Sequence, residues 1–202
     1  GGLDSSTVVA IAKKLYPNKK IRTFCIGLDK NSPDMVIARK LAKDLGTIHT
    51  EYTFTIKEGV EIIPAVVTAI ETIDKTTIRA STPMYILIKK MKQDYPEIKV
   101  LLSGEGADEL MCGYLGFHSS KTVKAAYEWS TFLMQNIHKF DVLRAHQCGM
   151  AHGVEVRVPF LDKYFMKYVR SVHPMSFVPM LGQEKYLLRQ AMAHLLPDYI
   201  IN

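Results

Sequence analysis

Apolar and polar positions along the first half of the chain follow two alternating patterns. Residues 21–28, 48–55 and 98–102 are short β-branched or alternating runs, which are typical of strands. Between them, apolar residues recur at helical spacing over residues 8–15, 33–45, 56–72 and 84–94. This alternation of strands and helices favours an α/β fold with a parallel sheet.

Prolines mark the boundaries of several predicted helices. Ser32 and Pro33 suit the N-cap and the first position of one helix. Pro64 should kink or break the helix that follows the second strand. The polar segment 71–83 is interpreted as a loop, and its last residue, a proline, lies near the start of the next helix.

The alternation stops in the second half of the chain, which predicts a C-terminal helical part. Helical spacing continues over residues 125–138, 141–150 and 183–196. Residues 154–162 look buried and extended, so Arg157 either pairs internally or reaches an anion. We expect a doubly wound parallel sheet. Because a strand should feed the first glycine turn of such a sheet, we expect the first strand to lie outside this sequence.

A glycine turn opens the first predicted helix at Gly1 and Gly2, and Asp4, Ser5 and Ser6 occupy the first helical turn. Exposed amides at a helix N-terminus form an anion site, and the hydroxyls add donors. A carboxylate there can hold a metal that bridges phosphate oxygens. The pattern GxxxxGK[ST] is absent, so the turn is not a Walker A loop. The alternative is ordinary capping of the helix.

A second turn follows the strand predicted over residues 98–102. Ser103 and Gly104 begin this turn, and Glu105, Asp108 and Glu109 give it three carboxylates. Ligands of open parallel sheets bind beyond the carboxyl ends of strands, which favours a ligand site here. The alternative is a well-capped turn with solvated carboxylates.

Two further groups of polar residues are candidates for ligand contacts. Thr76, Thr77 and Arg79 together suit a carboxylate ligand, because an arginine fork matches carboxylate geometry. Lys185 and Arg189 lie four residues apart on one face of the last predicted helix, where solvated cations are the default interpretation.

Charge and cysteine content narrow the function classes. The chain has 202 residues and a formal net charge of +6, which suits an anionic ligand. Lys and Arg are scattered and not interleaved with aromatic residues, so we expect no nucleic-acid partner. No apolar run is long enough to cross a membrane. Three widely spaced cysteines without a CxxC pair indicate free thiols, as in a cytoplasmic protein.

Six segments resemble one family when they are taken together and in order. GGLDSS (residues 1–6) is similar to the end of the pyrophosphate-binding loop of the N-type ATP pyrophosphatases, the PP-loop family. The others resemble the synthetase domain of glutamine-dependent asparagine synthetases: TTIRASTPMY (76–85), LLSGEGADEL (101–110), GYLGFH (113–118), GVEVRVPFLD (153–162) and EKYLLR (184–189). The resemblance implies an adenine nucleotide alpha hydrolase-like fold. Residues 1–202 are interpreted as one such domain, incomplete at both ends.

The resemblance implies ATP-dependent synthesis of asparagine with Mg²⁺. The side-chain carboxylate of aspartate attacks the α-phosphorus of ATP, β-aspartyl-AMP forms and pyrophosphate leaves. Ammonia then attacks the activated carbonyl to give asparagine and AMP. In the family the ammonia comes from glutamine, hydrolysed in an amidotransferase domain that this sequence does not include. A homodimer is the expectation for the full-length form.

The matching positions carry the implied roles. Glu105 and Lys185 would be catalytic, and Asp4 and Asp108 would hold Mg²⁺. The aspartate site would consist of Thr76, Thr77 and Arg79. ATP and pyrophosphate would contact Gly1, Gly2, Asp4, Ser5, Ser6, Ile26, Gly27, Ser103 and Gly104.

Three alternatives remain at this level. Another adenylating enzyme of the same fold, such as a β-lactam synthetase-like enzyme, would act on a bulkier acid. A tRNA-modifying PP-loop protein would need a nucleic-acid face and usually a catalytic cysteine pair, and neither is recognisable. A non-catalytic relative would serve in interaction or regulation.

Overall fold

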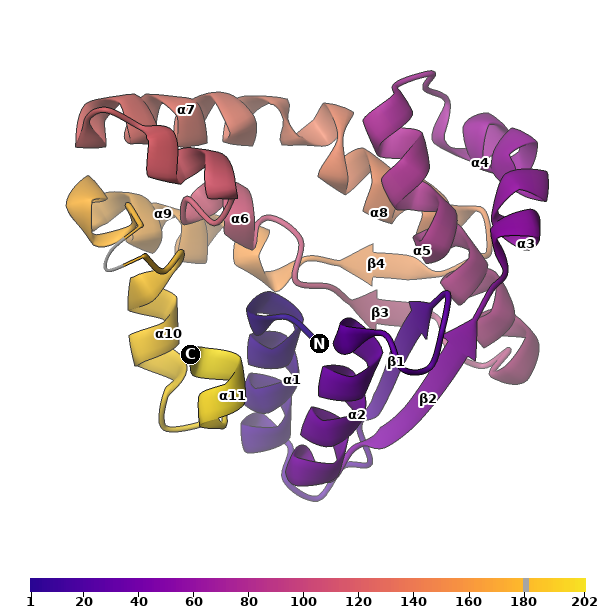
Figure 1. The fold of residues 1–202 in the computed structure, drawn as a ribbon. Coiled ribbons are helices and arrows are strands. Elements are labelled where there is room, and N and C mark those ends of the chain that lie inside the picture. Colours follow the sequence, from indigo (N-terminus) through magenta and orange to yellow (C-terminus); the bar gives the residue numbers. More distant parts are fainter. Residues whose placement is uncertain (180–181) are drawn as a thin grey trace.

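The computed structural model describes residues 1–179 and 182–202 and has a mixed α/β architecture (Figure 1). The first half contains α1 (Leu3–Leu15), β1 (Arg22–Gly27), α2 (Pro33–Leu45), β2 (Ile48–Thr53), α3 (Ile56–Glu61), α4 (Ile63–Ile70), α5 (Lys75–Asp94) and β3 (Val100–Leu102). The second half contains α6 (Ala107–Leu110), α7 (Val123–Asn136), α8 (Asp141–Met150), β4 (Glu155–Arg157), α9 (Lys163–Ser171), α10 (Tyr186–Met192) and α11 (Asp198–Ile201). Short 3₁₀ helices are η1 (Leu115–Ser119), η2 (Ile137–Lys139), η3 (Pro159–Leu161) and η4 (Pro174–Ser176).

The strands of the described residues form two separate parallel pairs. β1 pairs with β2 in a register that places Arg22 opposite Ile48. β3 pairs with β4, with Leu101 opposite Val156. The expected parallel pairing is therefore confirmed, while one continuous doubly wound sheet stays a prediction.

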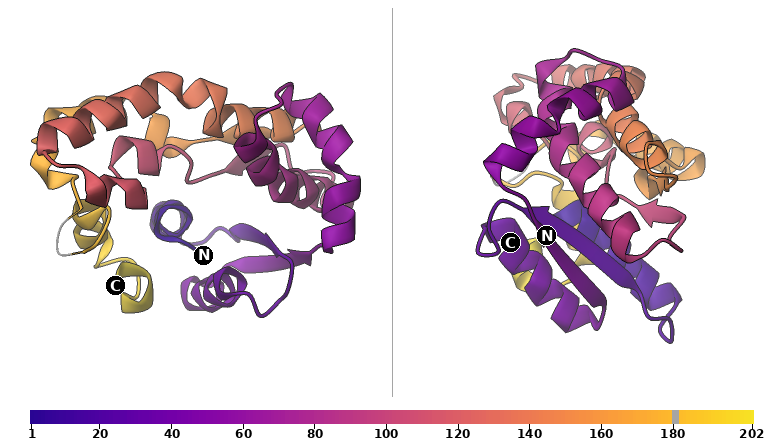
Figure 2. Two further views of the ribbon diagram at one scale, coloured as in Figure 1. Left: turned by 45° about the horizontal axis from the view of Figure 1, so that its top comes forward. Right: turned by 90° about the vertical axis from the view of Figure 1, so that its right-hand side faces the viewer.

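A cavity of about 470 Å³ lies between the two strand pairs, and we call it the inter-sheet cavity. Its walls include Phe24 of β1, Leu101 of β3, Val9 of α1 and Ile88 of α5. Helices α1 and α2 lie on one side of the strands and α5 lies on the other (Figure 2). The cavity therefore lies in the layer of the strands, with an edge of β1 on one side and an edge of β3 on the other.

Most predicted boundaries of the first half are confirmed. Pro33 occupies the first turn of α2, and Gly46 ends the helix with φ +63°. Ser32 is the N-cap, although its side chain makes no capping hydrogen bond. The expected break appears at Ile62, where α3 gives way to α4 just before Pro64.

The prediction of a loop over residues 71–83 is wrong, because α5 begins eight residues before Pro83. Asp74 is its N-cap and accepts hydrogen bonds from the Thr77 amide at 2.7 Å and the Thr77 hydroxyl at 2.8 Å. Pro83 lies inside this helix, and the Thr82 hydroxyl donates to the Ile78 carbonyl at 2.9 Å. A strong cap therefore starts the helix, and one missing amide donor does not end it.

Two expectations for the second half also differ from the structure. Arg157 is not buried: it pairs with Glu155 at 2.8 Å, and the two side chains are 59% and 58% exposed. The last long helix is shorter than residues 183–196, since α10 begins at Tyr186, and Asp198 then starts α11.

Two apolar clusters hold the elements together. One joins α1, α6 and the C-terminal helices and includes Ala10, Leu110 and Ile200. Accordingly α11 lies beside α1, with the N-terminus nearby (Figure 1). The other joins α4, α5 and α8 through residues such as Val66 and Met91. None of the helices in residues 1–179 and 182–202 is long and apolar enough to cross a membrane.

Candidate active site

The two glycine turns singled out in the sequence meet in space. A Cβ on Gly104, in the turn after β3, would lie 2.8 Å from the Asp4 Cβ and 2.8 Å from the Ser5 amide nitrogen of α1. Only glycine allows this approach. Between the turns lies a pocket of about 240 Å³, lined by Gly2, Asp4, Ser5, Ser103, Gly104, Glu105, Asp108, Glu109 and Tyr114.

A lysine from the far end of the chain reaches this pocket. Lys185 Nζ lies 2.5 Å from Asp4 Oδ2 and 2.7 Å from Asp108 Oδ1, so one ammonium group bridges both carboxylates. Lys185 is only 8% exposed. The default interpretation of a solvated cation is therefore wrong for this residue, because its charge is paired inside the pocket.

The backbone around Lys185 aims its side chain inward. Lys185 is the N-cap of α10 and has φ +53°, a left-handed conformation that is uncommon for a non-glycine residue. A Cβ on Gly113 would overlap Lys185 Cε and Asp108 Oδ1, so glycine leaves room for the lysine stem. Arg189 points elsewhere and donates to the carbonyls of Ile200 and Ile201.

The carboxylates suit a divalent cation. Burial and the neighbouring Asp108 raise the pKa of Asp4 to about 6, although Lys185 acts to lower it. Asp4 Oδ1 is buried without a hydrogen-bond partner in the described structure. Mg²⁺ prefers one or two carboxylates together with phosphate oxygens. Asp4 and Asp108 fit that requirement, and Lys185 Nζ now holds the positive charge between them.

Glu105 is held from the side by α8. Arg144 Nη2 donates to Glu105 Oε2 at 2.7 Å and also lies 2.9 Å from Asp141 Oδ1. Burial raises the pKa of Glu105, although Arg144 lowers it. Sequence reasoning missed Arg144 and Asp141. Their spacing of three residues in a predicted helix signals a pair but not its target.

Glu109 is buried and not solvated, against the interpretation of a capped turn with exposed carboxylates. It is 3% exposed, and the Tyr114 hydroxyl donates to its Oε1. The Ser130 hydroxyl donates to the Glu109 carbonyl at 2.6 Å. Burial raises the pKa of Glu109 to about 7.

Other predicted residues lie outside the lining of this pocket. Thr76, Thr77 and Arg79 occupy the first turns of α5, where Thr77 is buried and the other two are exposed. Ile26 and Gly27 end β1, and Gly27 is packed against Met35 and Ser32 of the α2 entry. Their assigned roles in aspartate and nucleotide binding stay predictions.

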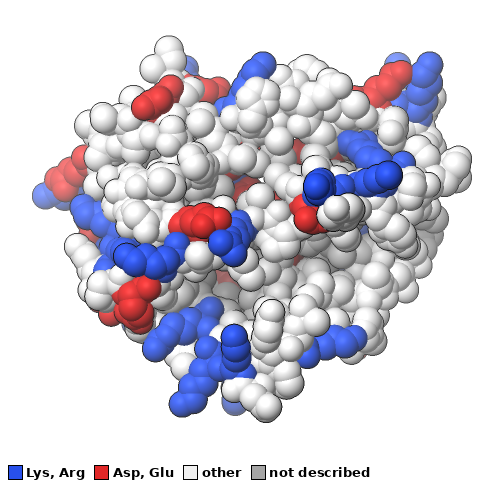
Figure 3. Space-filling model, turned by 180° about the vertical axis from the view of Figure 1, so that it is seen from behind, with Lys and Arg blue, Asp and Glu red and all other residues white. Residues whose placement is uncertain are grey.

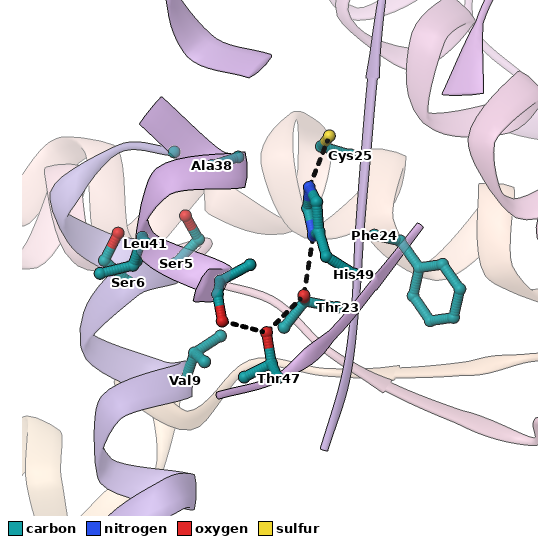
Figure 4. A pocket seen from close by; sticks show the side chains of 12 residues that line it. Ser5, Ser6, Val9, Thr23, Phe24, Cys25, Ala38, Leu41, Thr47 and His49 are labelled. Carbon is teal, nitrogen blue, oxygen red and sulfur yellow. Dashed lines mark hydrogen bonds between the residues drawn. The ribbon is translucent and has the colours of Figure 1, made fainter. Parts of the chain in front are cut away.

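Gly1 and Ser6 lie at a second, smaller cavity of about 80 Å³ between α1, α2 and the β1–β2 pair. His49 sits in it between Cys25 Sγ, at 3.3 Å, and the Thr23 hydroxyl, at 2.8 Å (Figure 4). Burial raises the pKa of Cys25 to about 11. The thiol is thus protonated at neutral pH, so Cys25 does not have the character of a nucleophile. Its hydrogen bond to His49 is a feature of the packing.

Charged side chains are interspersed over the face of the molecule opposite to that of Figure 1. Lys and Arg form several separate groups there, with Asp and Glu between them (Figure 3).

Among the described residues, no group of three or more His, Cys, Asp and Glu side chains is arranged to hold a metal ion. A cation in the pocket between the two glycine turns would therefore need ligands from phosphate besides Asp4 and Asp108.

Comparison with known proteins identifies the family. Residues 1–132 and 120–202 match the family described as asparagine synthase. The chain is 43% identical to an asparagine synthetase (glutamine-hydrolyzing) of Gallus gallus, covering all of this chain and 36% of the relative. It is 44% identical to asparagine synthetase (glutamine-hydrolyzing) 2 of Arabidopsis thaliana, covering 95% of this chain and 34% of the relative. The corresponding Homo sapiens protein is 41% identical, with 100% and 36% covered.

The chain thus spans about a third of the length of the curated relatives it matches. Similarity extends over all the elements that build the pocket, from the glycine turn at α1 to Lys185. On this evidence the chain belongs to the asparagine synthase family.

Proposed function

We propose that this chain is the ATP-using part of an asparagine synthetase. It would join aspartate to AMP with release of pyrophosphate, and then transfer the aspartyl group to ammonia. The observation that carries the proposal is the cluster of Asp4, Asp108 and Lys185 at the amino end of α1. The names of relatives that are 41–44% identical over this chain support the same chemistry.

The reaction must bring together two anions, the aspartate carboxylate and the triphosphate. Fixed donors and cations in a pocket with little water lower the cost of that approach. Lys185 supplies one positive charge for the phosphates and for the tetrahedral adduct with ammonia. Mg²⁺ bound by Asp4 and Asp108 would neutralise charge on phosphate oxygens. The pyrophosphate donors would come from the turn and first residues of α1, namely Gly1, Gly2, Ser5 and Ser6.

The remaining roles follow the resemblance to the family. Glu105 lines the same pocket and would accept the proton of the attacking ammonia. Contacts to the nucleotide would come from Ser103 and Gly104 and from the end of β1, Ile26 and Gly27. Contacts to aspartate would come from the first turns of α5: Thr76, Thr77 and Arg79.

We infer that the two strand pairs belong to one doubly wound parallel sheet with a further strand in the inter-sheet cavity. β1 and β3 each have an edge without a strand partner in the described structure, and both edges line this cavity. The contact between Gly104 and Ser5 places the amino end of α1 at the carboxyl end of β3. A parallel strand there would end where α1 begins, which supports a strand N-terminal to Gly1. Hydrogen exchange at the free edges of β1 and β3 tests this: protection in the full-length protein, but not in residues 1–202 alone, is expected.

We also propose the biological setting. Ammonia would come from an amidotransferase domain of the full-length protein, as the names of the glutamine-hydrolysing relatives support. That protein would be a homodimer. Cytoplasmic conditions would keep the three free thiols reduced.

Exchange of labelled pyrophosphate into ATP tests the proposed function in the full-length protein. We expect exchange that requires Mg²⁺ and aspartate, and we expect Asp108→Asn to reduce it by about a hundredfold or more. Asp162→Asn is the matched control, because Asp162 caps α9 and is not among the residues that line the pocket. Exchange with a bulkier acid but not with aspartate would indicate another adenylating enzyme of this fold. No exchange with any acid would indicate a non-catalytic relative.

A further inference from the structure

A short chain of half-buried charges runs from the active-site pocket into α8. Glu105, Arg144 and Asp141 have side chains that are 18%, 16% and 22% exposed. The contact between Glu105 and Arg144 spans 39 residues of sequence, so the fold brings the two together. Half-buried ion pairs of this kind contribute little net stability, because desolvation and side-chain ordering offset their attraction. Their presence beside a reacting site therefore calls for a further reason.

The geometry at Glu105 supplies that reason. Arg144 Nη2 is shared between Glu105 Oε2 and Asp141 Oδ1, at 2.7 and 2.9 Å. Asp141 is the first residue of α8, one helical turn before Arg144, so the rigid helix fixes the guanidinium. No hydrogen bond to Glu105 Oε1 occurs within the described part of the chain, and Glu105 lines the pocket. One carboxylate oxygen is thus anchored while the other stays available to a substrate.

We propose that Arg144, itself held by Asp141, is the positioning residue that orients the Glu105 carboxylate toward the reacting groups. This inference rests on the proposed function, because it assigns Arg144 a task in that reaction. Arg144 acts only through Glu105 and touches no substrate. Catalytic groups must be held within fractions of an ångström, and misplacement by about 1 Å can cost about a hundredfold in rate.

A double-mutant cycle in the full-length protein tests this assignment. Arg144→Met, Glu105→Gln and the double variant are compared for asparagine formation from aspartate, ATP and ammonia. We expect Arg144→Met to lower kcat by about a hundredfold, with the KM for ATP nearly unchanged. Arg144→Lys should restore part of that loss, because it keeps the charge but not the fork. The double variant should be no slower than Glu105→Gln alone, because coupled residues are not additive.

Control variants distinguish the loss of Glu105 positioning from a general loss of folded structure. Arg39→Met removes another arginine–glutamate pair, Arg39 with Glu51, away from the pocket, and should leave kcat unchanged. Asp141→Asn should lower kcat less than Arg144→Met does. Additive effects in the double variant, or a full-rate Arg144→Met, would overturn the inference. A wild-type protein without aspartate-dependent exchange would instead refute the proposed function itself.

Discussion

At the scale of single residues, Lys185 places its ammonium group between the two carboxylates that we propose as Mg²⁺ ligands. Its ammonium lies between Asp4 and Asp108, the two carboxylates assigned to Mg²⁺, within 2.7 Å of each. Two charges that a cation should compensate are thus already compensated by the protein. If the proposed metal–nucleotide complex binds there, Lys185 would have to move from between the two carboxylates toward the phosphates.

We expect Lys185→Met to raise the affinity of the nucleotide-free protein for Mg²⁺ at pH 8. The two carboxylates lose their internal cation and then attract an external one more strongly. The gain should be at least about tenfold, which is about 1.4 kcal/mol, in a calorimetric titration. Lys90→Met is the matched control, because Lys90 of α5 pairs with Glu58 of α3 and donates to the Thr53 carbonyl of β2. Equal Mg²⁺ affinity in Lys185→Met and wild type would contradict the competition between lysine and metal.

We expect His152 to make the folded protein less stable in acid. Burial lowers its pKa from the ordinary 6.5, and its Nε2 is buried without a partner in the described structure. The unfolded chain then binds a proton more readily than the folded one, so stability is lost as pH falls below about 6.5.

His152→Phe should remove this part of the acid sensitivity, since a phenyl ring can keep the edge contact with Tyr85, whose ring centroid is 4.4 Å away. Urea unfolding at pH 8 and pH 5.5 measures the difference, with the exposed His138→Phe as control. If wild type and His152→Phe lose the same free energy of unfolding between these pH values, the prediction fails.

At the scale of elements, sequence signals within a few residues of a helix end predicted the helix boundaries well. Ser32 with Pro33, Gly46 and Pro64 mark helix ends in the structure as they do in the sequence. The prediction failed at α5 because Pro83 also suits a first helical turn, while the cap at Asp74 lies nine positions before it. Local chemistry offered two starts for one helix, and packing of α5 against α4 and α8 favours the longer one.

Asp162 caps α9, and the contribution of this cap to stability can be measured. Its side chain accepts hydrogen bonds from the Tyr164 amide at 2.9 Å and the Phe165 amide at 3.1 Å, and so caps α9. Asp162→Ala should lower the free energy of unfolding by about 1 kcal/mol. Ser32→Ala is the control, because Ser32 occupies an N-cap without a side-chain hydrogen bond. Equal losses in chemical denaturation would mean that the cap bond at Asp162 contributes nothing.

At the scale of the whole molecule, the sequence predicted parts of the site but not its assembly. Asp4, Glu105 and Asp108 stand out because carboxylates follow glycine turns. Lys185 did not stand out locally, since its burial depends on a left-handed backbone and on a contact 181 residues away in sequence. Arg144 was missed because its partner Glu105 lies 39 residues away in the sequence. Only the folded chain shows which cation meets which carboxylate.

In the described structure β1 and β3 each have an edge without a strand partner, which affects how residues 1–202 behave in solution. Residues of both strands line the inter-sheet cavity, and Leu102, one of them, is 53% exposed. Uncovered strand edges of this kind recruit strands from other molecules. Residues 1–202 on their own should therefore self-associate as concentration rises, which sedimentation velocity would detect as growing oligomers. A concentration-independent monomer would contradict this expectation. Growing oligomers would mean that the edges that we propose to be covered in the full-length protein act as a template for aggregation.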